Sequence, residues 1–196
     1  MPSPSSFRLV AGRLTGILFL SAFVLYGAGS ALAPGALGSA LVLANSAAVV
    51  TIGVLCARVL RPDAPVTART YLVARGVEAL LLVVGLWLVV TGRAGDDIAY
   101  AGAMVALALG SLPFCRAVAN RWVPRWFAVW GAVGYVLMAA GAVADLLATG
   151  PGIYLAVPGG LFEIAFGVLL VVRGFPRVRT APSRPERVRH AGAEVA

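Results

Sequence analysis

The chain contains no lysine and only one histidine, His190. Cysteine is nearly absent as well, because Cys56 and Cys115 are the only two. Metal centres are commonly built from several histidines and cysteines, and serine hydrolases pair their nucleophile with a base. Ser46 and Thr51 have no evident activating base in the sequence. We therefore expect no metal, no cofactor and no enzymatic activity.

Charged residues are also scarce, and they are mostly of one sign. Only 12% of the residues are charged, whereas 60% are hydrophobic and the mean hydropathy is +0.92. Sixteen arginines against eight acidic residues give a net charge of +8. In a soluble protein such a charge suggests nucleic acid. Here the arginines flank apolar segments, so the expected partners are the lipid bilayer and its anionic headgroups rather than nucleic acid.

Long apolar segments are abundant. No charged residue occurs from Leu14 to Ala57, a stretch of about 44 residues that Pro34-Gly35 divides. A helix needs about 20 apolar residues to cross the bilayer core. This stretch therefore predicts two membrane spans joined by a tight turn.

The remaining charges define the other spans, two of which must contain ionisable residues. Only about 14 uncharged residues separate Glu78 from Arg93, so the third span carries Arg75 and Glu78. For the same reason Glu163 lies inside the last span. We predict an all-α polytopic membrane bundle over residues 14–173, after a cytoplasmic segment at 1–13 and before a disordered tail at 174–196. Its six spans are 14–33, 38–57, 71–91, 98–116, 126–147 and 153–172.

The distribution of arginines predicts the orientation. Fifteen arginines fall on the side of the two termini, and Arg93 alone falls on the other. Cytoplasmic flanks are enriched in basic residues. We therefore expect both termini in the cytoplasm and the protein in the bacterial cytoplasmic (inner) membrane. A cleaved signal peptide ending at Ala31-Leu32-Ala33 is the alternative for the first span, but its apolar run is long and Pro34 would follow the cut.

Glu163 is the first candidate for a functional residue. It lies near the middle of the last span, where a carboxyl group is costly and often functional. Pro158, Gly159 and Gly160 precede it and predict a break in the helix. Transporters build substrate or proton sites from broken helices beside such groups. The alternative is a structural carboxyl that is hydrogen-bonded to a neighbouring span.

Arg75 and Glu78 form the second candidate site. Their spacing of three places them on one helix face, where they can pair. We expect Arg75 to lie close enough to the cytoplasmic boundary to extend its guanidinium toward it. The functional reading is a gate or an anionic-ligand pocket. The structural reading is an ion pair that fixes the rotation of the helix.

The remaining features predict structural roles. Trp122, Trp126 and Trp130 recur at every fourth residue and are typical of an interfacial aromatic belt. Asp96 and Asp97 suit an N-terminal helix cap. Five arginines in the proline-containing tail are expected to contact anionic headgroups: Arg177, Arg179, Arg184, Arg187 and Arg189.

Several short motifs, taken in order, resemble one known family. They are Arg75-Gly76-Val77-Glu78; Val123-Pro124-Arg125-Trp126-Phe127-Ala128-Val129-Trp130-Gly131; Leu155-Ala156-Val157-Pro158 with Leu161-Phe162-Glu163; and Val172-Arg173-Gly174-Phe175. From Arg8 to Phe175 the chain resembles the bacterial six-span membrane family catalogued as domain of unknown function 4386. The resemblance implies an integral membrane protein without an assigned activity. It assigns no catalytic or binding role to any residue of this chain.

Two function classes follow. The first and favoured one is a non-enzymatic membrane component that binds protein partners or lipids. The second is a small-solute or proton-coupled transporter, with Glu163 as its titrating group and Arg75 and Glu78 near its cytoplasmic gate. A transporter requires a polar cavity that reaches Glu163, whereas a packed structural bundle encloses this residue.

Overall fold

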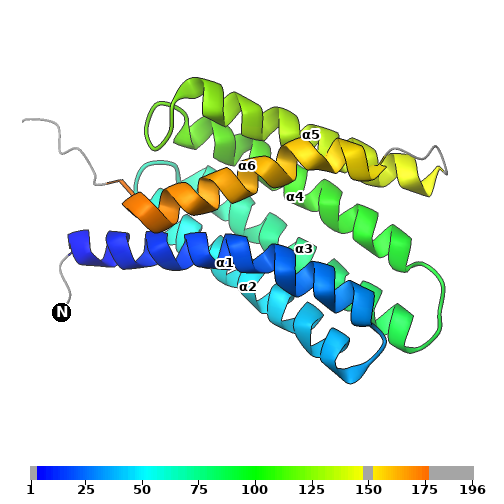
Figure 1. The fold of residues 1–196 in the computed structure, drawn as a ribbon. Helices are drawn as coiled ribbons and strands as arrows, with labels where there is room; N and C mark the ends of the chain where they lie inside the picture. The colour runs from blue at the N-terminus through cyan, green and yellow to red at the C-terminus, as the bar shows by residue number, and fades with distance from the viewer. Residues whose placement is uncertain (1–3, 148–151, 177–196) are drawn as a thin grey trace, which may run out of the picture.

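The computed structural model describes residues 4–147 and 152–176, and within them the chain is all-helical (Figure 1). The predicted fold class is thereby confirmed. Each of the six helices is long and apolar enough to cross a membrane. They are α1 (Pro4–Leu32), α2 (Ala36–Leu60), α3 (Pro65–Val90), α4 (Asp96–Val118), α5 (Arg125–Leu146) and α6 (Gly152–Arg173).

Several helices begin earlier than the predicted spans, and the earlier start of α3 changes the depth of its charged residues. This helix begins at Pro65 rather than near Tyr71, because proline suits the first turn of a helix, where its missing N–H needs no partner. At a rise of about 1.5 Å per residue, Arg75 lies roughly 15 Å along α3. It is therefore deeper in the bundle than the sequence suggested.

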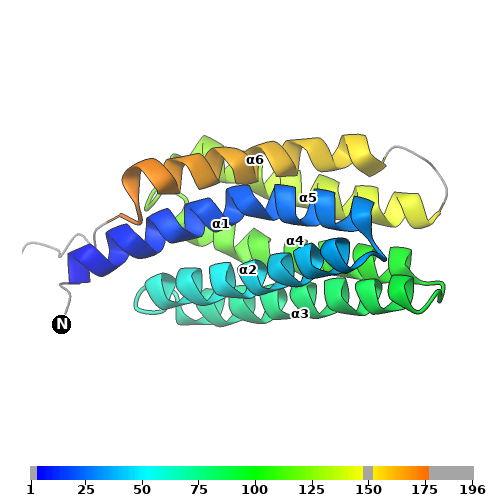
Figure 2. The ribbon, with the colours of Figure 1, turned by 60° about the horizontal axis from the view of Figure 1, so that its bottom comes forward.

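The helices pack in a closed ring. Each helix contacts the next one along the chain, and α6 contacts α1. The start of α1 and the end of α6 lie at one end of the bundle, which we call the terminal end (Figure 2). The Phe175 N–H there donates a hydrogen bond to the Arg8 carbonyl at 3.3 Å.

The outer surface of the ring is apolar. Val24, Leu80 and Val129 are 69%, 62% and 53% exposed, and large hydrophobic residues are exposed on every helix. A soluble protein rarely exposes apolar patches of this extent, whereas lipid tails solvate such a surface well. The chain is a multi-pass membrane protein.

Charge divides the two ends of the bundle. Among the described residues, the terminal end carries Asp63 and nine arginines outside the ring: Arg8, Arg13, Arg58, Arg61, Arg69, Arg116, Arg121, Arg125 and Arg173. The opposite end carries Arg93, Asp96, Asp97 and Asp145. One end is therefore strongly basic, and the other is weakly acidic.

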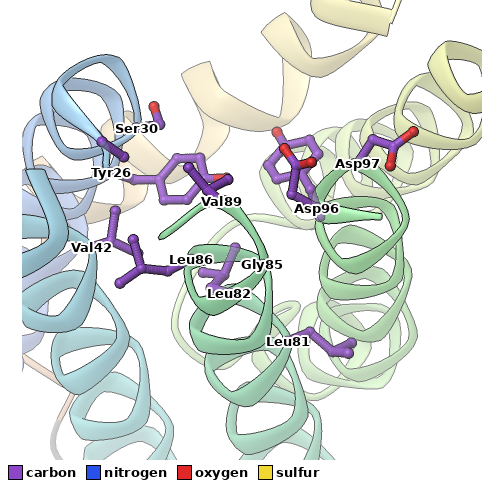
Figure 3. Close-up of a pocket in the computed structure, with 12 residues that line it drawn as sticks. Tyr26, Ser30, Val42, Leu81, Leu82, Gly85, Leu86, Val89, Asp96 and Asp97 are labelled. Carbon is purple, nitrogen blue, oxygen red and sulfur yellow. The ribbon is translucent and has the colours of Figure 1, made fainter. Parts of the chain in front are cut away.

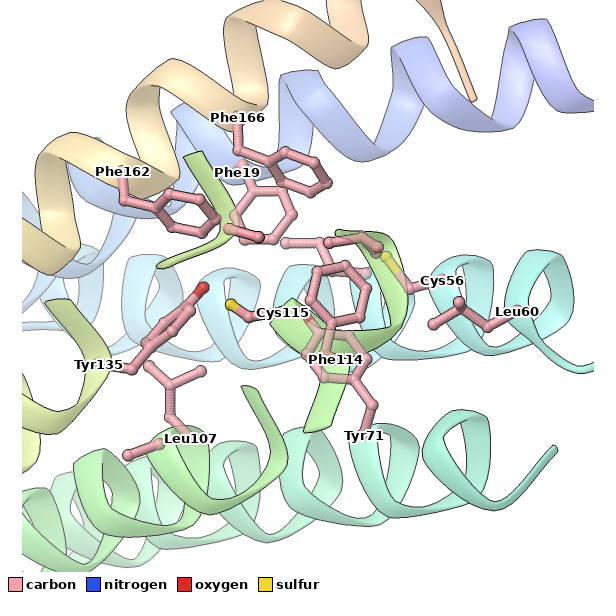
Figure 4. Close-up of a cluster of buried hydrophobic side chains, with 14 of the residues drawn as sticks. Phe19, Cys56, Leu60, Tyr71, Leu107, Phe114, Cys115, Tyr135, Phe162 and Phe166 are labelled. Carbon is pink, nitrogen blue, oxygen red and sulfur yellow. The ribbon is translucent and has the colours of Figure 1, made fainter. Parts of the chain in front are cut away.

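Aromatic side chains fill the ring toward the terminal end (Figure 4). Tyr71 stacks on Phe114 with ring centroids 4.4 Å apart, and Phe166 contacts both Phe114 and Phe19 edge to face. Phe162 continues the cluster toward the middle of the ring. All five side chains are essentially inaccessible. This half of the ring is closed by tightly packed rings.

The predicted break in the last span is wrong, because α6 runs unbroken through Pro158, Gly159 and Gly160. Proline is tolerated inside membrane helices, although it removes the N–H that would bond to the Tyr154 carbonyl. The Pro158 carbonyl accepts a hydrogen bond from Trp130 Nε1 at 3.1 Å. A Cβ atom added to Gly134 would lie 2.7 Å from Gly159 Cα. The glycine therefore permits close packing of α5 against α6 rather than interrupting α6.

Trp126 points outward, whereas Trp122 packs on Phe175 and Trp130 donates a hydrogen bond to α6, so the interfacial belt stays a prediction. One further prediction requires correction. Asp96 and Asp97 do not cap α4. Gly95, whose φ of 107° favours glycine, is the N-cap residue, and the aspartates occupy the first turn of α4. There they still face the positive end of the helix dipole.

Candidate functional site

Arg75 lies at the centre of a buried polar cluster inside the ring. Its Nη1 donates to Glu78 Oε2 at 2.7 Å, so the predicted pair forms. Its Nε donates to the Tyr71 hydroxyl at 3.1 Å, one helical turn away. Arg75 and Glu78 are only 2% and 4% exposed. The guanidinium is therefore held by its own helix and points into the ring, away from the lipid-facing surface.

The same guanidinium reaches across the ring to Glu163. Arg75 Nη2 lies 3.6 Å from Glu163 Oε1, which also accepts a hydrogen bond from the Tyr135 hydroxyl at 3.0 Å. The sequence treated Glu163 as separate from the pair on α3. The structure instead joins α3, α5 and α6 in one cluster.

The expectation that Arg75 extends toward the cytoplasmic boundary is wrong. Its side chain points into the ring, where its guanidinium carbon lies 5.3 Å from the Phe19 ring centroid and 5.5 Å from that of Tyr71. A buried cation is tolerated only with close opposite charges and hydrogen bonds. Here the carboxyl groups of Glu78 and Glu163 supply the opposite charges, and the two aromatic faces add cation–π attraction.

The cluster carries more negative than positive formal charge. One guanidinium, that of Arg75, faces two carboxyl groups, those of Glu78 and Glu163. If all three are ionised, the sum is one negative charge in a largely apolar ring. Such an imbalance is costly in a membrane interior. A proton or a cationic ligand would neutralise it.

A cavity of about 290 Å³, which we call the central cavity, reaches this cluster. Arg75, Glu78 and Glu163 line one part of it. The remaining wall is mostly apolar and aromatic, and includes Phe19, Phe23, Tyr26, Tyr100, Met104 and Met138. A mostly apolar cavity with a few convergent polar groups is the usual form of a small-molecule site.

Asn45 of α2 adds an unsatisfied polar group to the central cavity. The residue is 3% exposed and lines the cavity. Its Oδ1 has no hydrogen-bond partner within the part of the chain that the structure describes. Buried polar atoms are almost always paired, so an unpaired one calls for a physical explanation.

A second cavity, of about 330 Å³, lies toward the acidic end of the bundle (Figure 3). We call it the end cavity. Asp96 and Asp97 line it, as does Ser30. Tyr26, Leu82 and Tyr100 line both cavities, and the two tyrosine rings stack with centroids 5.8 Å apart. The stacked tyrosines therefore separate two adjoining cavities.

Other reactive groups take no part in the cluster. The Ser46 and Thr51 hydroxyls donate to the Val42 and Ala47 carbonyls of their own helix. Cys56 and Cys115 are free and buried. Over residues 4–147 and 152–176, no three potential metal-ligating side chains come together. The five tail arginines predicted to contact lipid lie outside the described residues.

Sequence reasoning missed Asn45, Tyr71 and Tyr135. None is charged, so none attracts attention in an apolar segment. Tyr71 lies four residues before Arg75, and this helical spacing was a usable signal. Asn45 is a polar residue in the middle of an apolar segment, and this position was a second usable signal. Nothing in the sequence indicated that Tyr135 faces Glu163.

No curated protein and no solved structure matches the chain. A family model does match it, over residues 87–174, which hold the end of α3 and all of α4, α5 and α6. Glu163 and Tyr135 fall within this match, whereas Arg75, Glu78 and Asn45 precede it. The family resemblance is thereby confirmed for this part of the chain, which matches the model described as Domain of unknown function (DUF4386).

Proposed function

We propose that this protein binds a small solute inside the membrane and transports it, with Glu163, Arg75 and Glu78 as the binding centre. One observation carries the proposal: the central cavity reaches Glu163. A bundle built only for structural support gains nothing from a cavity beside its most costly buried charges. The cavity therefore favours the transporter over the non-enzymatic component that binds protein partners or lipids, which the sequence favoured.

The uneven packing of the ring supports this function. Toward the terminal end, Phe114 packs edge to face on Phe166, and a Cβ atom at Gly16 would meet the Gly167 carbonyl, so α1 and α6 touch. Toward the acidic end, the central cavity lies between Phe23 on α1 and Ala156 on α6. A site that opens toward one end and is sealed at the other is what alternating access requires of one state.

The chemistry of the ring argues for transport rather than catalysis. The two hydroxyls weighed as nucleophiles, those of Ser46 and Thr51, are bonded to backbone carbonyls rather than to a base. A nucleophile needs an adjacent base that activates it. We propose that the protein is not an enzyme and uses no cofactor.

The charge of the two ends supports the proposed location. The basic terminal end faces the cytoplasm, and the acidic end faces outward, because basic flanks are retained inside. We propose the bacterial cytoplasmic membrane, with both termini cytoplasmic. The arginines at the terminal end would contact anionic headgroups there. In this orientation the end cavity opens to the outside.

Access to the central cavity can be tested with cysteine substitutions. Ala156→Cys places a thiol on the cavity wall, and Val24→Cys places one on the lipid-facing surface. A membrane-impermeant, cationic methanethiosulfonate reagent is applied to the protein in nanodiscs. Wild-type protein gives the baseline, because Cys56 and Cys115 are buried. We expect modification of Ala156→Cys and none of Val24→Cys. An unmodified Ala156→Cys would mean that water does not enter, and the transport proposal would fail.

A further inference from the structure

We propose that the ligand of the central cavity is a small primary ammonium ion, which binds between Asn45 Oδ1 and the carboxyl groups of Glu78 and Glu163. The inference rests on the proposed solute-binding function and adds the chemical class of the solute. It begins from two facts: the cluster has one guanidinium for two carboxyl groups, and Asn45 presents an acceptor without a donor.

The charge of the cavity selects a cation. Arg75 is engaged by Glu78 Oε2, Glu163 Oε1 and the Tyr71 hydroxyl. Its donors are thus directed at groups of the protein itself, so a carboxylate ligand would compete with them. A cationic ligand instead removes the surplus negative charge, and it does so where the low dielectric makes neutralisation most favourable.

The acceptors select a cation that carries several N–H donors. Asn45 Oδ1 lies on α2, Glu78 on α3 and Glu163 on α6, so the acceptors surround the cavity from three helices. A primary ammonium has three N–H bonds and can serve several of these acceptors at once. A quaternary ammonium carries the same charge but would leave Asn45 Oδ1 unpaired, at the cost of its desolvation.

The remaining wall suits the rest of such a molecule. Phe19, Phe23, Tyr26 and Tyr100 line the cavity together with Met104 and Met138. Aromatic faces attract cations, and apolar side chains accept a short alkyl chain. A volume of about 290 Å³ limits the ligand to a small molecule.

The route into the cavity favours a cation as well. The described residues at the acidic end contribute Asp96, Asp97 and Asp145 against Arg93 alone. Two of these aspartates line the end cavity, which adjoins the central cavity at Tyr26 and Tyr100. Surface charge of one sign concentrates ligands of the opposite sign. The basic terminal end repels cations, so entry occurs past the stacked tyrosines.

The test measures binding to the full-length protein in phosphatidylcholine nanodiscs by calorimetry. The probes are n-butylammonium, n-butanol, butanoate and butyltrimethylammonium, which share one alkyl chain. We expect n-butylammonium to bind at least about tenfold more tightly than each of the other probes. It alone combines a positive charge with N–H donors, and hydrogen bonds between charged groups are stronger than those between neutral groups. A probe other than n-butylammonium binding equally well would overturn the ammonium assignment.

Asn45→Leu tests the location of the site. This variant removes an unpaired buried acceptor and keeps the side-chain volume, so it is expected to fold. We expect it to weaken n-butylammonium binding about tenfold. Ser46→Ala is the matched control, because Ser46 is buried next to Asn45 but bonds to its own helix. Unchanged affinity in Asn45→Leu would place the bound amine elsewhere and overturn the proposal.

The outcomes separate this inference from the proposed function. If Ala156→Cys is modified but no n-butylammonium binds, the ligand class is wrong and the transport proposal stands. If neither occurs, both are wrong. A primary ammonium also occurs in phosphatidylethanolamine headgroups. Nanodiscs made with this lipid would block n-butylammonium binding if the headgroup is the source, and would leave it unchanged if a free amine is.

Discussion

Arg75 Nη2 lies 3.6 Å from Glu163 Oε1, and this contact links α3 to α6 across the middle of the helix ring. The two helices are not neighbours in the ring, whose packing runs from each helix to the next and from α6 to α1. The long guanidinium side chain therefore makes the connection that the backbones do not. Around this contact the protein assembles its buried charges and its central cavity.

Removal of the closest partner of Arg75 should destabilise the bundle. In Glu78→Ala the 2.7 Å ion pair is lost, and the buried guanidinium keeps the longer ion pair with Glu163 and the hydrogen bond to the Tyr71 hydroxyl. We expect a loss of about 3 to 5 kcal/mol in the free energy of unfolding. Unfolding in mixed micelles with increasing denaturing detergent measures it. Asp63→Ala, at an exposed loop residue, should change stability by less than about 0.5 kcal/mol. Equal stabilities for the two variants would contradict the role of the pair.

The Tyr135 hydroxyl should contribute to stability through Glu163. Tyr135→Phe removes the donor at 3.0 Å while retaining the ring that packs against Phe162. We expect a loss of about 1.5 to 3 kcal/mol, the range for a hydrogen bond to a charged group. Tyr154→Phe is the matched control, since Tyr154 is 76% exposed. If both variants unfold alike, the hydrogen bond to Glu163 adds nothing to stability.

Close packing of α5 on α6 should make Gly134 intolerant of a side chain. A Cβ atom there would lie 2.7 Å from Gly159 Cα, a backbone atom, so the helix itself would have to shift. We expect Gly134→Ala to destabilise the bundle by about 1 to 3 kcal/mol. Gly76→Ala provides the contrast, because nothing lies within 4 Å of a Cβ atom at that position. Alanine is the better helix former, so Gly76→Ala should be neutral or stabilise by up to about 1 kcal/mol. The reverse order would refute the packing argument.

The orientation can be tested with single cysteines in the loops at the two ends. Asp63→Cys lies in the loop after α2 at the basic end, and Ala94→Cys lies in the loop before α4 at the acidic end. With an impermeant maleimide on intact cells, we expect labelling of Ala94→Cys alone. Asp63→Cys should react only after lysis, because basic flanks stay in the cytoplasm. The opposite pattern would invert the proposed topology.

The sequence predicted the fold because the bilayer sets a length that apolar segments must meet. Proline and charged residues mark where those segments end, as at Pro34 and Arg58. The pairing of Arg75 with Glu78 also followed from local helix geometry, which depends on spacing alone.

The candidate site was only partly predictable from the sequence, because it depends on how the ring closes. Glu163 was identified from its depth, but its contact with Arg75 requires knowing which helices face each other. Asn45 and Tyr135 carry no charge and matter only through what they face. The continuity of α6 was missed because proline and glycine weaken a helix locally, whereas their close packing against α5 depends on how the two helices meet.

The most direct test of the central claim is the solvent access of Glu163 itself. Infrared difference spectra of wild-type protein and Glu163→Gln in nanodiscs assign the carboxyl band of this residue, and transfer from H₂O to D₂O then reports its access to water. Because the central cavity reaches Glu163, the account predicts that its band shifts well before the amide bands of the buried helices exchange. A band that stays unchanged until those amides exchange would show that the bundle encloses Glu163, and would contradict a solute site in the ring.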